Sequence, residues 1–200
     1  MSARSIACVT GALLSLWIGA SRAQSRQEWP TYPLGQAPAE LQPAIRRGEL
    51  VILAIQTATS KELASALSGG PPEAVRVCHL SATALIYRLR RDEGIAAGRT
   101  AARVRMPANA PRPWASPIVT RYANAKAASF DGFAVDLGDK VGVMQPVAHR
   151  PVCSPCHGVE EKLDPRVREE LKDRYPADHA TGFKDGDLRG WIWVEVPKNH

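Results

Sequence analysis

The residues best suited to chemistry lie in the last quarter of the chain, where Cys153, Cys156 and His157 form the pattern C-x-x-C-H. This spacing lets two thiols reach the two vinyl groups of one porphyrin and form thioethers, while the adjacent histidine is carried under the iron. The sequence therefore predicts one covalently attached haem c, with His157 as an axial ligand of its iron.

Two other interpretations of these cysteines stay open. Cys153 and Cys156 could form a redox-active or structural disulfide, although a thioredoxin-like site is normally set in a βαβ unit, and the pattern here shows none. A zinc site with Cys78 would need four converging ligands, which the neighbouring Cys156 and His157 could supply only with difficulty. Covalent haem is the favoured interpretation.

The second axial ligand of the iron is left open by the sequence. Cys78 is the one cysteine outside the motif and the leading segment, and its thiolate is a soft ligand that suits iron. Its other interpretation is a small buried hydrophobic residue. The remaining candidates are histidines and methionines: His79, His149, His179, Met106 and Met144.

Three arginines are candidates for binding the haem propionates. Arg99, Arg103 and Arg105 alternate with smaller residues over 98–106, a segment expected to be extended, so they would share one face of a strand. Guanidinium groups bind carboxylates through a planar fork. The alternative is a solvated basic strand edge, and Arg189 has the same two interpretations.

Residues 1–23 have the features of a cleaved export signal. Arg4 precedes an apolar run over 6–20, and small residues end the segment where signal peptidase cleaves. An uncleaved anchor is the alternative, and no later segment is expected to span a membrane. We therefore expect a periplasmic protein of a Gram-negative bacterium, which agrees with thioether attachment outside the cytoplasm.

The composition, with 44% hydrophobic and 23% charged residues, is that of a folded soluble protein. The formal net charge of +6 falls to +4 when Arg4 and Arg22 leave with the signal. Basic and acidic residues alternate, so a nucleic-acid partner is not expected. The chain has neither a serine elbow nor a phosphate-binding glycine loop, and we expect no enzymatic activity.

After the signal, the pattern predicts an extended arm at 24–38 and a single domain at 39–200. Helical spacing of apolar residues predicts a helix over 39–67 and a second helix from Pro72 to Gly94 with Cys78 on its apolar face. Helices before strands without βαβ alternation predict an α+β fold, an antiparallel sheet flanked by helices. The other expected elements are a short helix at 114–127, hairpin strands at 130–137 and 141–147, a polar helix at 165–174 and a strand at 190–196.

Several short motifs follow one another along the chain, at 77–78, 98–100, 105–111 with Trp114, 153–158, 175–176, 180–183 and 186–190. In their order and spacing they resemble a family of periplasmic c-type-haem domains with a PAS-like fold. That family was long catalogued as a domain of unknown function and occurs alone or as the sensing part of bacterial signalling proteins.

The resemblance implies a PAS-like sheet flanked by helices, with the iron held between His157 and Cys78. The family usually has Asn where this chain has Met106, and Ser where it has Ala101. Met106 is therefore a competing axial ligand.

Thiolate ligation holds ferric iron and weakens on reduction, which suits sensing better than electron transfer at high potential. We therefore expect a haem-based redox or gas sensor that binds CO or NO and signals to a separate partner protein. The alternative is a mono-haem electron-transfer cytochrome c with two permanent axial ligands.

Overall fold

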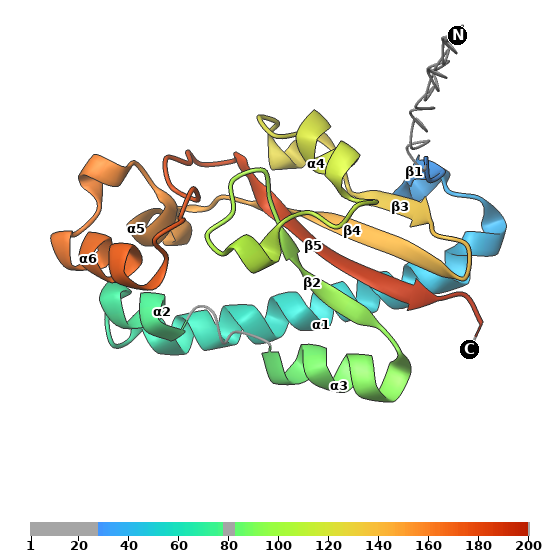
Figure 1. Cartoon of the computed structure of the whole chain (residues 1–200), viewed down its shortest axis with the longest axis horizontal. Coiled ribbons are helices and arrows are strands. Elements are labelled where there is room, and N and C mark those ends of the chain that lie inside the picture. Colours follow the sequence, from blue (N-terminus) through green and yellow to red (C-terminus); the bar gives the residue numbers. More distant parts are fainter. Residues whose placement is uncertain (1–27, 78–82, 200) are drawn as a thin grey trace, which may run out of the picture.

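The computed structural model describes residues 28–77 and 83–199, which build a five-stranded antiparallel sheet with helices against it (Figure 1). In chain order the helices and strands are β1 (Thr31–Pro33), α1 (Gln42–Leu67), α2 (Pro71–Val77), α3 (Thr83–Glu93), β2 (Ala96–Thr100), α4 (Ser116–Arg121), β3 (Phe133–Asp136), β4 (Lys140–Ala148), α5 (Ser154–His157), α6 (Pro165–Arg174) and β5 (Leu188–Pro197).

The strands lie in the order β1-β3-β4-β5-β2, and every neighbouring pair is antiparallel. The long strands β4 and β5 form the centre and pair from Lys140 with Pro197 to Ala148 with Leu188. This arrangement confirms the predicted α+β class and is consistent with a PAS-like domain. The predicted hairpin, the helix at 165–174 and the last strand are all present.

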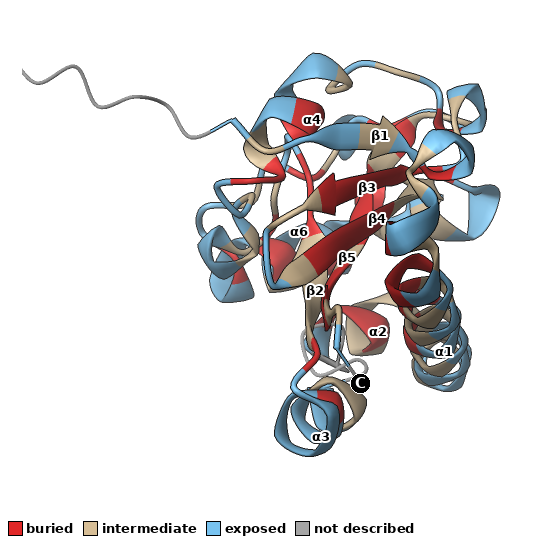
Figure 2. Ribbon diagram, turned by 90° about the vertical axis from the view of Figure 1, so that its right-hand side faces the viewer, coloured by how far each residue is buried: buried red, intermediate tan, exposed pale blue. Residues whose placement is uncertain are grey.

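Alternation along β4 divides the core between the two faces of the sheet. Val141 and Val143 face α1, whose Ile45, Ile52 and Ile55 are buried against them. Gly48 lets this helix approach closely, because a Cβ atom there would lie 2.9 Å from the Cγ2 atom of Val143. The long N-terminal helix is thus held by a stripe at helical spacing (Figure 2).

The opposite face carries an aromatic cluster below α4. Met144 is fully buried there among Trp114, Phe133 and Trp191. The buried carboxylate of Glu195 accepts a hydrogen bond from the indole Nε1 of Trp114 at 2.9 Å. This contact holds the proline-rich segment before α4 against β5.

Three segments differ from the expectation. The arm at 24–38 contains the edge strand β1, paired with β3, so the sheet begins before residue 39. The strand expected over 98–106 ends at Thr100, whose pairing with Trp191 is the last between β2 and β5. The helix expected over 114–127 is shorter, at Ser116–Arg121.

The second predicted helix is described only in two parts. α2 ends at Val77 and α3 begins at Thr83. Cys78 and His79 lie outside the described residues, as does the signal segment at 1–23, so their predicted roles stay predictions.

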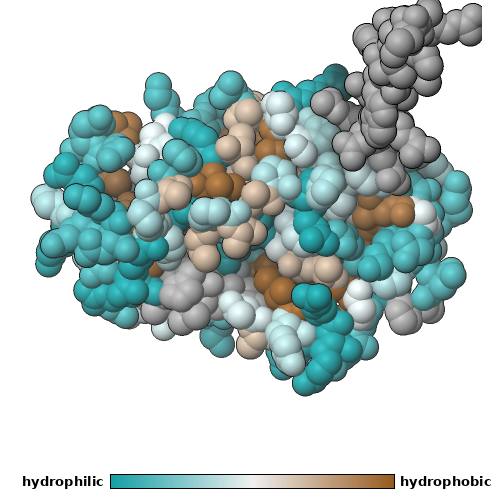
Figure 3. All heavy atoms as spheres, in the orientation of Figure 1, coloured by the Kyte–Doolittle hydropathy of each residue, from teal (hydrophilic) through white to brown (hydrophobic). Residues whose placement is uncertain are grey.

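One stretch of the described chain, Ala39–Leu67, is apolar and long enough to cross a membrane by length and composition alone. The expectation that no segment after the signal is apolar over a sufficient length was wrong, whereas the expectation that none spans a membrane stays a prediction. The same stretch packs Ile45, Ile52 and Ile55 on the sheet as a core helix. On the face drawn in Figure 3, apolar side chains lie in separate areas among hydrophilic ones.

Candidate functional site

The C-x-x-C-H residues lie on the short helix α5 and the residue before it. Cys153 ends a 3₁₀ turn, and the helix then carries Cys156 and His157. Residues three apart share a face of a helix, so the two half-buried cysteines lie on one side of this turn. They are not joined in a disulfide. Figure 1 shows α5 and α6 together at one end of the sheet.

Both ring nitrogens of His157 have defined partners. Nδ1 lies 2.6 Å from the carbonyl oxygen of Ala180, and Nε2 lies 3.0 Å from Nη2 of Arg189. A guanidinium group can only donate, so Nε2 must accept and Nδ1 must carry the proton that it donates to Ala180. The two contacts therefore fix one neutral tautomer with its lone pair on Nε2.

The protonation state follows from the surroundings of this imidazole. Burial lowers the pKa of His157 well below its ordinary value, and the positive charges of Arg189 and Arg105 lower it further. The hydrogen bond to Ala180 opposes this but does not reverse it. His157 is thus neutral, and the lone pair of its Nε2 has a fixed direction. A neutral imidazole nitrogen is the form that binds a metal ion.

Arg105 joins the motif helix to the loop before β5. Its Nη2 donates to the carbonyl oxygen of Cys156 at 2.6 Å, and its Nε donates to Asp178 at 2.9 Å. Asp178 also accepts from the backbone N–H of Ala180 at 2.7 Å. Since Ala180 in turn holds His157, the ion pair orients the imidazole through two short links.

The ring of Phe183 lies at the centre of a second set of contacts. The guanidinium carbon of Arg103 lies 3.7 Å from its centroid, close enough for a cation–π interaction. His149 stacks on the same ring at 5.9 Å, and His157 meets it edge-on at 6.5 Å. Arg103 also donates to the carbonyl oxygen of Thr181 at 2.7 Å.

His149 is a buried histidine beside the motif helix. Its Nε2 lies 3.1 Å from the hydroxyl oxygen of Ser154, and its Nδ1 has no hydrogen-bond partner among the described residues. Burial is the main cause that lowers its pKa, and the charge of Arg189 adds to it. A neutral His149 therefore supports the start of α5.

A small apolar cluster brings α2 and α6 to the other side of the motif. Val75 packs there with Val167, Leu171 and Tyr175, and Met106 and Cys156 lie against this cluster. The last described residue before Cys78, Val77, ends α2, which contacts both α5 and α6.

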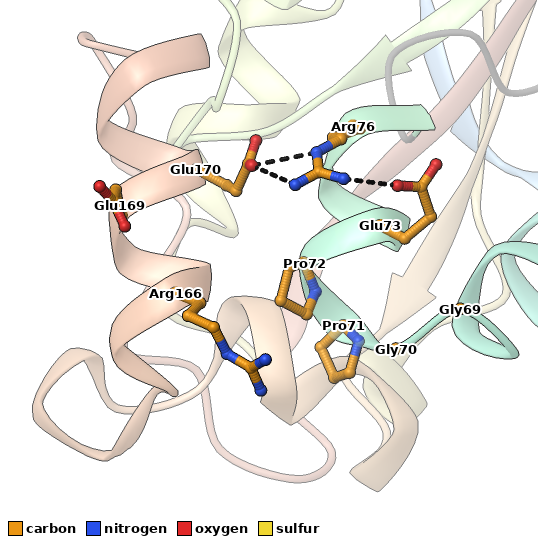
Figure 4. A pocket seen from close by; sticks show the side chains of 9 residues that line it. All are labelled: Gly69, Gly70, Pro71, Pro72, Glu73, Arg76, Arg166, Glu169 and Glu170. Carbon is orange, nitrogen blue, oxygen red and sulfur yellow. Dashed lines mark hydrogen bonds and ion pairs between the residues drawn. The ribbon is translucent and has the colours of Figure 1, made fainter.

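Between α2 and α6 there is also an open cleft of about 620 Å³. Arg76 bridges its two sides, at 2.8 Å from Glu73 and 2.6 Å from Glu170 (Figure 4). Arg166 lines the same cleft. The charged groups of Arg76, Glu73 and Glu170 in this cleft are therefore paired with one another.

Only some of the arginines predicted to bind haem propionates lie near the motif. Arg105 reaches the motif at the Cys156 carbonyl, whereas Arg103 lies over Phe183. Both come from a bent segment after Thr100 rather than from one face of a strand, so the predicted shared face is wrong. Arg99 stays on β2 opposite Ile192. Sequence reasoning missed Asp178, for which no motif gave a signal.

The candidates for a second axial ligand are also separated. Met144 is buried in the aromatic cluster, and His179 is exposed. Met106 lies in the cluster that contacts Cys156, and His149 faces Ser154. Within residues 28–77 and 83–199, no three His, Cys, Asp or Glu side chains are grouped to hold a metal ion.

The fold and site define an α+β domain with an oriented histidine on a C-x-x-C-H helix. Residues 36–197 match the model of the Tll0287-like family, and the chain belongs to that family. A solved structure, that of the cyanobacterial heme-protein Tll0287, is 20% identical and covers 80% of this chain and 97% of its own, with a TM-score of 0.59. That likeness shows a shared fold. No curated protein matches the chain.

Proposed function

We propose that this protein carries one covalent haem c, attached through Cys153 and Cys156 and ligated by His157. The observation that carries the proposal is the neutral His157, whose Nε2 lone pair is oriented from the same turn that holds both cysteines. The proposal agrees with the family and with the heme-protein that shares the fold.

The residues present fit such a group. Nδ1–H of His157 donates to the Ala180 carbonyl, which keeps the ring from turning and raises the basicity of Nε2. Arg105 holds the Cys156 carbonyl and, through Asp178, the Ala180 loop. When bound, the haem would supply an iron that changes oxidation state by one electron and can bind a diatomic gas. The chain's own part is to attach, orient and partly shield it.

For the second axial ligand we propose Cys78. α2 contacts α5 and packs its Val75 in the cluster that contacts Cys156. Its last residue, Val77, directly precedes Cys78 in the sequence. A thiolate there would favour a redox or CO/NO sensing role, since its bond to iron weakens on reduction.

The second candidate function is a mono-haem electron-transfer cytochrome c. The observation in its favour is Met106, which packs in the same cluster as Cys156. A methionine ligand would be permanent in both oxidation states and would raise the reduction potential.

The wider setting is part of the same proposal. We propose export to the periplasm, a role without catalysis, and a signalling or redox partner protein rather than nucleic acid. The predicted signal at 1–23 and the place of thioether attachment outside the cytoplasm support this.

The test is to produce the exported chain with a haem-c maturation system and to record ferric, ferrous and CO-treated ferrous spectra. Covalent haem that is lost in Cys153→Ala/Cys156→Ala is expected. Wild-type protein without covalent haem would overturn the proposal and favour the disulfide.

Two further variants separate the functions. If the protein is a sensor, the wild type is expected to show a thiolate-type ferric spectrum and to bind CO when reduced. Cys78→Ser should abolish that ferric spectrum. Met106→Leu is the matched variant. Loss of the native ferric spectrum in Met106→Leu alone, with no CO binding in the wild type, would favour the electron carrier.

A further inference from the structure

Arg189 lies at an irregularity in the central strand pair. Val147 pairs with Gly190, but the next residue, Ala148, pairs with Leu188, so Arg189 is the extra residue of a β-bulge on β5. On the other side, β2 has already ended, since its last pair joins Thr100 to Trp191. Bulges next to functional sites redirect a side chain away from its regular position.

The neighbouring residue fixes this bulge. A Cβ atom at Gly190 would lie 2.6 Å from the carbonyl oxygen of Thr100 and 3.0 Å from the Cβ atom of Ala101. Only glycine therefore lets β5 pass this point at its present distance from β2. The backbone before and after Arg189 is thus held by the pairing of Leu188 and Gly190 with β4.

The redirected side chain ends on the motif histidine. Nη2 of Arg189 donates to Nε2 of His157 at 3.0 Å, the one ring nitrogen that Ala180 does not engage. An iron ligated by His157 must use the same lone pair, so the guanidinium would have to release it. Because the bulged backbone is fixed, the released charge would stay within one side chain's reach of the iron.

We propose that Arg189 is a positioning residue of the haem site, which selects the ligating tautomer of His157 and, after iron binding, raises the haem reduction potential through its positive charge. This inference rests on the proposed haem function. The physical reason is that ferric iron carries one more positive charge than ferrous iron, so a nearby cation favours the reduced state. Arg105, the buried arginine at the motif, donates instead to Asp178 and to the Cys156 carbonyl.

The first test is a redox titration of haem-loaded protein. Arg189→Met is expected to lower the ferrous-to-ferric ratio at a given potential about tenfold, a shift of about 59 mV for one electron, whereas Arg189→Lys stays close to the wild type. Arg121→Met is the control, since it removes an exposed guanidinium that lies over Tyr122 on α4. Equal potentials in Arg189→Met and Arg121→Met would overturn the proposed effect on the haem.

The second test does not need haem. The ¹⁵N shift of His157 Nε2, measured at fixed pH in the haem-free chain, is expected to move in Arg189→Met because the donor is lost, and to stay unchanged in Arg121→Met. An unmoved shift would overturn the role of Arg189 even if haem attachment succeeds. If the wild-type chain carries no covalent haem but the Nε2 shift still moves in Arg189→Met, only the proposed haem function is overturned.

Discussion

The side chains around His157 show how a few charged groups can be placed in a partly buried site. The pair Arg105 and Asp178 is almost completely buried, with 8% and 11% of the side chains exposed. Each partner also binds backbone, at Cys156 and Ala180. A buried ion pair of this kind contributes little net stability by itself, but removing one partner leaves an uncompensated charge.

Arg105→Leu is therefore expected to lower the free energy of unfolding by about 3–5 kcal/mol, measured by chemical denaturation of the haem-free chain. The double variant Arg105→Leu/Asp178→Leu should lose less than the single variant, because no charge stays buried alone. Arg91→Leu is the control, since Arg91 and Asp92 form an exposed pair. A loss in Arg105→Leu no larger than in this control would contradict the network.

His149 gives the domain a pH-dependent stability. Its pKa is lowered in the folded state by burial, while in the unfolded chain it has its ordinary value of about 6.5. Below that pH the unfolded chain binds the proton more readily than the folded one. The stabilising contribution is thus complete above about pH 6.5 and is lost as the pH falls below it.

We expect the thermal unfolding midpoint of the haem-free chain to decrease as the pH is lowered from 7.5 to 5. In His149→Gln the same midpoint should decrease less steeply. The measurement is thermal unfolding across this range. His179→Gln, at an exposed histidine, should leave the slope unchanged. An identical slope in wild type and His149→Gln would show that the buried ring makes no such contribution.

Among the helices and strands, α1 is positioned by its contact with the middle of the sheet. At Gly48, a Cβ atom would lie 2.9 Å from Val143 Cγ2 and 3.1 Å from Val194 Cγ2. Both valines are fully buried and cannot move aside easily. The helix therefore needs a residue without a side chain at this one position.

Gly48→Ala is expected to destabilise the domain by about 1 kcal/mol, because overpacking of about 1–3 kcal/mol exceeds the gain in helix propensity of about 1 kcal/mol. The double variant Gly48→Ala/Val143→Ala should be less destabilised than the sum of its two single variants, as measured in a denaturation cycle. Additive losses would mean that the two residues do not press on each other.

Across the whole molecule, the sheet is completed by a strand that precedes the expected start of the domain. β1 pairs with β3, from Thr31 with Val135 to Pro33 with Phe133, and Leu34 follows it into the core. Residues 31–33 thus form the edge strand of the sheet next to β3.

A chain that starts at residue 39 is expected to be less stable than one that starts at residue 28, by at least about 2 kcal/mol for the lost burial of Leu34 alone. Amide hydrogen exchange should rise over Phe133–Asp136, because β3 becomes an edge strand. Equal protection of β3 in the two chains would show that β1 adds nothing to the sheet.

Features that depend on residues close together in the chain could be predicted from the sequence. The C-x-x-C-H spacing, the helices at 39–67 and 165–174 and the last strand all follow from patterns within a few turns of chain. The α+β class followed from their order. The predicted ligand Cys78 lies outside the described residues and stays a prediction.

Contacts between side chains that are distant in the sequence depend on the complete fold. Arg105 and Asp178 are 73 residues apart, and Arg189 and His157 are 32 apart, so no local pattern brings them together. Their contacts depend on where β2 ends and on a one-residue bulge in β5. Such details arise from the packing of the whole sheet. The sequence therefore indicated the C-x-x-C-H residues, but it named Arg105 and Arg189 only as candidates for binding propionates and did not show that they contact Cys156 and His157.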